Sequence, residues 1–243
     1  EIERSARILT ARQHHRRVFN PARARCTANA MQRFTPPQRL FAYTVAGLAG
    51  FVDVTGYLQL NGYFVSFMTG NTTLLARDLA EGASRVAVPA LLIAGFVIGV
   101  VTGTLVGDRV ASRRKVVVTG LVATLLICAA LARMAEMREI SLGLLVIAMG
   151  ALNTVLSANR ESPVGLTYMT GALVRTGQLL ADRLSGDRTA DPLPFALLWV
   201  SLLTGALCGG VLAMQWGAAS LWVAGGLALT LCLAATRIAP ARA

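Results

Sequence analysis

The chain has 243 residues, of which 55% are hydrophobic and only 14% are charged, and its mean hydropathy is +0.59. A soluble domain normally carries about a quarter charged residues, so this composition excludes an ordinary soluble domain. The net charge of +11 is concentrated at one end, since the first 39 residues hold nine Arg and two Glu. The basic balance therefore describes a tail and short loops. It does not indicate a nucleic-acid-binding face, and we expect no nucleic-acid partner.

Residues 1–35 are expected to form a disordered basic tail. Met31 stands nine residues ahead of the first apolar run and is our favoured true start; a transit peptide is the alternative. The tail has no apolar run of the kind that a secretory signal needs. Residues 36–243 are expected to form a single integral membrane domain.

The apolar segments predict helices that cross a lipid bilayer. A bilayer core of about 30 Å needs around 20 apolar helical residues. Six segments reach or approach that length: 40–60, 86–107, 116–132, 140–157, 193–214 and 219–236. We therefore predict an all-α polytopic membrane bundle that has the lipid bilayer as its partner. Two shorter segments, 62–76 and 164–174, are rich in Gly, Thr and Ser, and we interpret them as broken or re-entrant helices. If both cross instead, the chain has eight spans.

The two halves of the chain repeat one another in order. Met68-Thr69-Gly70 corresponds to Met169-Thr170-Gly171, and upstream Gly50 and Asp53 correspond to Gly150 and Asn153. Each half then continues with glycines at four-residue spacing, which are Gly95, Gly99, Gly103 and Gly107 in the first half and Gly205 and Gly209 in the second. We predict two repeats of three spans each, about 40–133 and 139–237.

The placement of Lys and Arg predicts the orientation. With six spans and the N-terminus inside, the basic cluster Arg109, Arg113, Arg114 and Lys115 falls on the cytoplasmic side, as the positive-inside rule requires. Eight spans would place this cluster outside. We expect both termini in the cytoplasm of a bacterial cell and an inverted relation between the repeats.

Asp53 is the most informative polar residue. A carboxylate near a helix centre costs roughly 2.5–3.5 kcal/mol on insertion scales, so it should face the bundle and have a partner. Two interpretations stay open: a carboxylate that couples transport to protons or cations, or a hydrogen-bonded group that fixes packing. Its counterpart Asn153 cannot ionise and favours the structural interpretation. Arg175 could neutralise Asp53 where the halves meet, or extend to the interface.

The residues around the two Met-Thr-Gly segments favour breaks in a helix. They are Thr69, Gly70, Asn71 and Thr72 in the first half, and Thr170 and Gly171 in the second. The backbone groups freed at such breaks can bind a small solute or ion. Tight helix crossing is the alternative interpretation. The spaced glycines form faces of the Gly-x-x-x-Gly kind, which pack either against the opposite repeat or in a homodimer seam.

These residues resemble a family. The chain resembles the YoaK-like bacterial membrane proteins, the domain of unknown function 1275, in the type and order of these residues: Gly50, Asp53, Gly56, Tyr57, Phe64, Met68, Thr69, Gly70 and Asn71. The resemblance covers about 40–236 and is looser in the second half, where Ala172 replaces a polar residue. It implies an integral membrane protein and no particular activity.

We interpret the protein as a secondary transporter or permease for a small solute, because an inverted repeat, broken segments and an intramembrane carboxylate occur together. A non-transporting membrane scaffold is the alternative. We expect no enzyme, metal or cofactor, because the two His residues, His14 and His15, lie in the tail and no catalytic or phosphate-binding motif occurs.

Overall fold

The computed structural model describes residues 34–156 and 169–238. Within these ranges every regular element is a helix, which confirms the all-α class. Most of the basic tail and the candidate start at Met31 lie outside the described residues.

The main helices in chain order are α3 (Pro36–Gln59), α4 (Met68–Ala80), α5 (Ala87–Arg109), α6 (Arg114–Met134), α7 (Arg138–Leu152), α8 (Met169–Leu184), α9 (Leu193–Trp216) and α10 (Ser220–Ala235). Short 3-10 turns precede three of them, at Ser84–Val86, Ala111–Arg113 and Gly217–Ala219. Local sequence explains several boundaries. α3 begins with a capping box between Thr35 and Gln38, and the last long apolar run breaks at Gly217, whose φ of +56° suits glycine.

Four helical stretches of the described chain are long and apolar enough to cross a membrane: Pro36–Gln59, Ser84–Arg109, Ala111–Met134 and Leu193–Ala235. The last contains both α9 and α10, joined by the turn at Gly217. α7 has 15 residues, so it is about 22 Å long and shorter than a bilayer core. The chain is therefore a membrane helical bundle.

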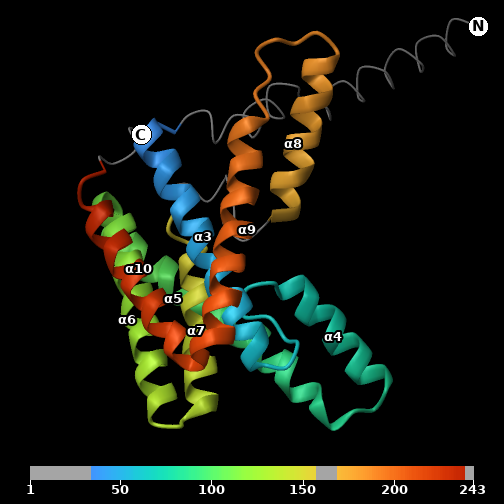
Figure 1. The fold of residues 1–243 in the computed structure, drawn as a ribbon, viewed down its shortest axis with the longest axis vertical. Coiled ribbons are helices and arrows are strands. Elements are labelled where there is room, and N and C mark those ends of the chain that lie inside the picture. The colour runs from blue at the N-terminus through green and yellow to red at the C-terminus, as the bar shows by residue number, and fades with distance from the viewer. Residues whose placement is uncertain (1–33, 157–168, 239–243) are drawn as a thin grey trace, which may run out of the picture.

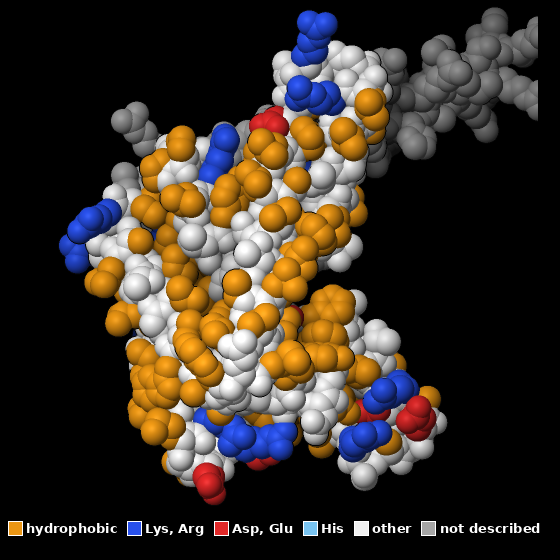
Figure 2. Space-filling view, in the orientation of Figure 1, with side chains coloured by type: hydrophobic (Ala, Val, Ile, Leu, Met, Phe, Trp, Pro, Cys, Tyr) orange, Lys and Arg blue, Asp and Glu red, His pale blue; other side chains and the backbone are white. Residues whose placement is uncertain are grey.

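The long helices pack in pairs: α3 lies along α9, α5 along α7, and α6 along α10. α4 packs on α5, and α8 packs on α9. Figure 1 shows that α4 and α8 project from the same side of the bundle, near opposite ends of its long axis. On the face drawn in Figure 2, Lys and Arg gather towards the two ends, and the surface between them is largely apolar. This distribution fits a bilayer around the middle of the bundle.

Glycines bring α3 and α9 into backbone contact. A Cβ on Gly205 would overlap the carbonyl oxygen of Gly47, and a Cβ on Gly209 would lie 2.5 Å from the carbonyl oxygen of Phe51. From the other side, a Cβ on Gly50 would overlap the carbonyl oxygen of Leu202. No residue larger than glycine fits at these crossings.

The α5–α7 pair is built in the same way. A Cβ on Gly99 would overlap the carbonyl oxygen of Ile147, and one on Gly150 would overlap that of Phe96. A Cβ on Gly103 would lie 2.9 Å from the Cα of Ala151. The ends of the stripe are looser, since added Cβ atoms would lie 3.3 Å from Val146 at Gly95 and 3.0 Å from Arg114 at Gly107. Both glycine faces are thus covered by helices of the same chain.

Substituting alanine for Gly50 or Gly150 should destabilise the fold by about 3 kcal/mol, because the added methyl meets backbone that cannot move aside. Gly143→Ala on α7 is the matched control, since a Cβ there meets nothing within 4 Å. Thermal unfolding of the purified proteins in detergent measures the difference. Equal midpoints for Gly150→Ala and Gly143→Ala would contradict the close α5–α7 contact.

Candidate functional site

The chain turns back on itself after α3. Asn61 and Gly62 have φ values of +53° and +104°, and the Gly62 N–H donates to the carbonyl oxygen of Tyr57 over 3.2 Å. Left-handed residues in succession make a sharp reversal. The loop 61–67 therefore starts beside the last turns of α3, and α4 begins directly after it.

Asp53 holds this loop to α3. Its Oδ1 accepts hydrogen bonds from the N–H groups of Val65, at 3.1 Å, and Ser66, at 2.8 Å. Asp53 lies six residues before the end of α3, about 9 Å along the axis. The expectation that it sits near the helix centre is wrong, because α3 begins at Pro36, four residues ahead of the apolar run.

Asn71 holds the same loop to α4. Its side chain is fully buried; Oδ1 accepts from the Phe64 N–H over 3.0 Å, and Nδ2 donates to the Phe64 carbonyl oxygen over 2.7 Å. The Asn71 amide thus bonds both backbone groups of Phe64, as a neighbouring strand would in a β-sheet. The structure brings Asp53 and Asn71 together around residues 64–66, where each satisfies backbone groups that no helix or sheet provides for.

Two glycines of the motif make room for the loop. A Cβ on Gly56 would lie 2.5 Å from Cγ1 of Val65, whose side chain is fully buried. A Cβ on Gly70 would lie 2.9 Å from the Phe64 ring and would overlap the ring of Phe67. The spacing that resembles a family motif therefore encodes close contacts between α3, the loop and the first turn of α4.

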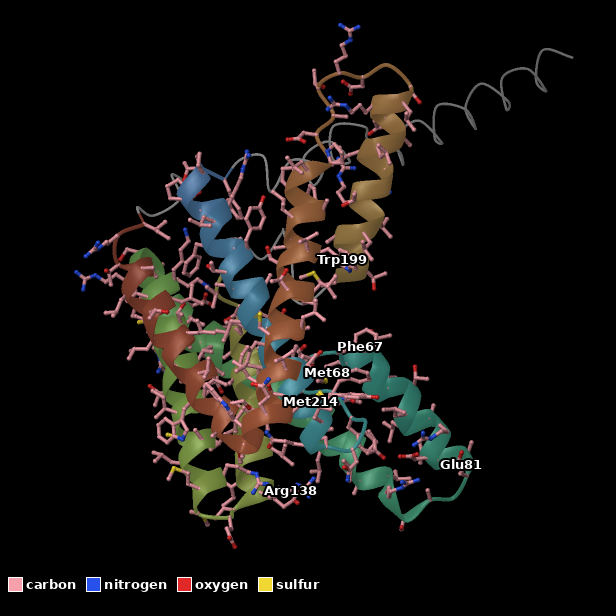
Figure 3. The ribbon with its side chains drawn as sticks, in the orientation of Figure 1. Phe67, Met68, Glu81, Arg138, Trp199 and Met214 are labelled. Atoms are coloured by element: carbon pink, nitrogen blue, oxygen red, sulfur yellow. The ribbon has the colours of Figure 1, made fainter. Side chains whose placement is uncertain are left out.

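Three aromatic rings lie over this contact. The ring centroids of Tyr57 and Phe64 are 5.0 Å apart, and Phe64 and Phe67 meet edge to face at 5.1 Å. Both arrangements are favourable for aromatic pairs. Figure 3 shows Phe67 and Met68 at the start of α4, on the side that faces the space below α8.

A second carboxylate, which the sequence analysis missed, ties the loop to the far part of α4. The Tyr63 hydroxyl donates to Oδ2 of Asp78 over 2.8 Å, and Arg77 Nε donates to Oδ1 over 2.9 Å. Asp78 is fully buried although it lies next to the exposed Arg77. The sequence offers one sign of this buried carboxylate, an Arg-Asp pair near the end of a short apolar segment. The same pattern is equally typical of an ordinary ion pair at the surface.

The surroundings of Asp78 keep it ionised. The Arg77 guanidinium, and then the Tyr63 hydroxyl, lower the pKa of Asp78; burial, and then Asp78, raise the pKa of Tyr63. A carboxylate with a lowered pKa contributes stability that is fully present above its ordinary pKa of about 3.9 and is lost as the pH falls through its folded value. The Tyr63–Asp78 tie should therefore persist throughout the neutral range.

Thr69 and Thr72 differ from Asp53 and Asn71 in being exposed. The Thr72 hydroxyl donates to the Met68 carbonyl oxygen over 2.9 Å, within its own helix. The residue before α4, Phe67, provides no side-chain cap. These threonines thus lie on the outer surface of α4 and not in the contact with α3.

The candidate residues of the second half lie elsewhere. Thr170 is exposed and Gly171 is half-buried in the first turn of α8, while Asn153 caps α7 and donates to the Met149 carbonyl oxygen over 2.9 Å. Arg175 donates to Gln178 on its own helix over 3.1 Å. The ion pairs of the described residues do not include Asp53, so the hypothesis that Arg175 neutralises it is wrong for this conformation.

Two arginines, Arg138 and Arg114, bind the ends of helices. Arg138, labelled in Figure 3, donates to the carbonyl oxygen of Gln59 at the end of α3. Arg114 donates to the carbonyl oxygen of Thr154 over 3.0 Å and pairs with Asp108 at 2.6 Å. Each satisfies a carbonyl that a helix end leaves open. Among the described residues no group of three or more His, Cys, Asp or Glu side chains could hold a metal ion.

The all-α fold and the apolar helices long enough to cross a bilayer define an integral membrane protein. Residues 41–234 match the family model described as "Protein of unknown function (DUF1275)", and the chain belongs to this family. It is 37% identical over 196 residues to the UPF0700 transmembrane protein RA0705 of Rhizobium meliloti (strain 1021), which covers 80% of this chain and 84% of the relative. No solved structure gives a significant match.

Replacing Asn71 with leucine should destabilise the protein by about 2–4 kcal/mol, because the N–H and carbonyl of Phe64 both lose their partner in a buried place. Thr72→Val, which removes an exposed hydroxyl from the same helix, is the matched control and should be nearly neutral. Thermal unfolding in detergent gives the comparison, and limited proteolysis reports whether the loop 61–67 opens. An Asn71→Leu protein as stable as Thr72→Val would show that the amide does not hold the loop.

Proposed function

We propose that the protein is a secondary transporter for a small solute, built from two inverted repeats, with its solute site beside the loop 61–67 and the starts of α4 and α8. The observation that carries the proposal is the equivalence of the two close helix pairs. α9 of the second half packs on α3 of the first, and α5 of the first packs on α7 of the second.

The glycine contacts of the two pairs correspond position by position. Gly50 meets the Leu202 carbonyl and Gly150 meets the Phe96 carbonyl. Gly150 follows Gly50 by 100 positions, and Leu202 follows Phe96 by 106. The Gly205–Gly47 and Gly99–Ile147 contacts obey the same two offsets. In both pairs a helix of one half packs on a helix of the other half at equivalent positions. This arrangement supports an internal pseudo-two-fold axis, which is usual in inverted-repeat transporters.

The short helices supply the second support. α4 has 13 residues and α8 has 16, so they are about 20 and 24 Å long and fall short of a bilayer core. Figure 1 shows them directed towards opposite ends of the bundle. Half-helices that start inside the membrane and run to opposite faces are typical of solute sites in transporters, where irregular backbone lines a cavity.

In this proposal the two close pairs act as the rigid parts, and the less enclosed α4 and α8 act as gates on the two sides. Backbone contact at glycines resists sliding, whereas α4 buries only Asn71 and Asp78 and α8 only Ala172 and Leu179. Elements with few buried contacts open at lower free-energy cost than packed ones. Asp53 lies where the first gate meets the rigid part.

A non-transporting scaffold is the second candidate, and one observation favours it. Asp53 and Asn71 use their polar atoms to hold backbone of the same chain, as a purely structural motif would. A scaffold would need a partner surface, for which the exposed faces of α4 and α8 are the available elements.

The six-span topology predicts that a reporter fused after Lys115 lies in the cytoplasm, because the turn between α5 and α6 is then on the same side as both termini. Alkaline phosphatase and green fluorescent protein fusions at that point measure the side. A fusion within Glu81–Ala83, between α4 and α5, should report the opposite side. Phosphatase activity at Lys115 would exclude the inverted repeat and favour eight spans.

A solute that the protein transports should stabilise the folded protein only when the carboxylate of Asp53 is present. We expect one class in a thermal-shift panel of amino acids, short carboxylic acids and organic amines to raise the melting temperature of the native protein and of Glu81→Gln, but not of Asp53→Asn. Glu81 is the matched acidic control, since it lies at the outer end of α4 (Figure 3). Uptake of the stabilising solute into proteoliposomes then tests transport. A panel without any stabilising solute would favour the scaffold.

A further inference from the structure

The loop 61–67 and α4 form one internally braced unit. Asn71 joins α4 to Phe64 through two hydrogen bonds, and Asp78 joins α4 to Tyr63. Neither tie reaches α3. The hydrogen bonds that fasten the unit to α3 through a side chain are those that Asp53 accepts from the loop. The unit can therefore move as a body if that attachment changes.

Residues suited to a hinge stand at both ends of this unit. Asn61 and Gly62, at its start, and Gly82, at its end, have positive φ values of +53°, +104° and +61°. A Cβ on Gly82 would meet nothing within 4 Å, so the turn there is open. Movements of re-entrant or lid segments are usually absorbed by a few such loop residues.

The two carboxylates that hold the unit differ in their charge partners. Asp78 pairs with Arg77 at 2.5 Å, so its tie is insensitive to pH in the neutral range. Asp53 has no basic partner among the described residues, and its negative charge is held by backbone N–H donors. The hydrogen bonds to an ionised carboxylate are about twice as strong as those to a neutral one. A proton on Asp53 would thus weaken the attachment to α3 and leave the other ties intact.

Among the residues that the structure describes, no other ionisable side chain hydrogen-bonds the loop 61–67 to α3. The ionisable groups on the elements packed around this part of α3 are Tyr57 on α3, Tyr63 in the loop, Arg77, Asp78 and Glu81 on α4, Arg138 and Glu139 on α7, Cys208 on α9 and Cys232 on α10. Arg138 bonds to the backbone at the end of α3, and the charged pair Arg77–Asp78 is closed on itself.

We propose that Asp53 is a proton-operated latch: when ionised it fastens the loop 61–67 and α4 to α3, and when protonated it releases them as one unit. This inference rests on the proposed function, for which it supplies the coupling ion. Protonation would open the first gate, so uptake of solute would be linked to protons. The buried side chains of Tyr63 and Val65 limit the movement to a local opening.

Hydrogen–deuterium exchange tests the latch without any solute. The purified full chain in lipid nanodiscs is labelled across pH about 4 to 8, and each rate is divided by that of an unstructured peptide of the same sequence. We expect the amides of Val65 and Ser66 to lose protection by about tenfold as Asp53 becomes protonated, which corresponds to the weakening of one charge-assisted bond. In Asp53→Asn the same amides should exchange at the faster rate at every pH.

Glu81→Gln is the matched control and should keep the native pH dependence. Protection that is independent of pH in the native protein would overturn the latch, as would a pH dependence that persists in Asp53→Asn. Should Asp53→Asn not fold, the native protein and Glu81→Gln still decide the question. Uptake of a solute that does not depend on protons, together with loop protection that does not depend on pH, would refute the latch and leave transport standing. Loop protection that depends on pH, without uptake of any solute, would support the latch and count against transport.

Discussion

The structure depends on how backbone polar groups are satisfied inside a membrane. Helices do this internally, but the loop 61–67 forms no helix or sheet, so its N–H and carbonyl groups need partners from other parts of the chain. Asp53 and Asn71 supply those partners from the helices on either side. The hydrogen bonds of this polar pair in an apolar sequence are thereby explained without any ligand. In the latch that we propose, the same constraint also supplies the chemistry, because a carboxylate that holds a loop would weaken its hydrogen bonds when protonated.

The close glycine contacts set the frame within which the loop is held. Gly50 lies one turn before Asp53 on α3, and its contact with Leu202 fixes the position of that part of α3 against α9. Because Gly56, one turn after Asp53, accepts Val65 of the loop, the carboxylate stands between two tight contacts. Its geometry is therefore fixed by backbone packing on one side and by the buried Val65 side chain on the other, which is the kind of preorganisation that a functional carboxylate needs.

The sequence predicted those features that depend on local pattern and missed those that depend on three-dimensional contact. Apolar runs and the break at Gly217 located the helices, and glycine spacing indicated the close pairs. Asp53 lies farther from the helix centre than expected, because Pro36 and the capping box extend α3 beyond the start of the apolar run. The burial of Asp78 was missed because only the fold brings Tyr63, fifteen residues earlier, against it. No pattern along the chain specifies that contact.

The two glycine-lined helix pairs make matching contacts, but the polar residues that follow Gly50 and Gly150 differ. Gly50 and Gly150 make matching contacts, whereas Asp53 of the first half corresponds to Asn153, which donates to its own helix. An amide cannot change charge, so Asn153 could not act as the proton-operated latch that we propose for Asp53. If the halves gate opposite sides of the membrane, a proton would act on one gate and not on the other. Such an asymmetry is what proton coupling requires, since a device that responded equally on both sides would have no means of linking the proton to one step of the cycle.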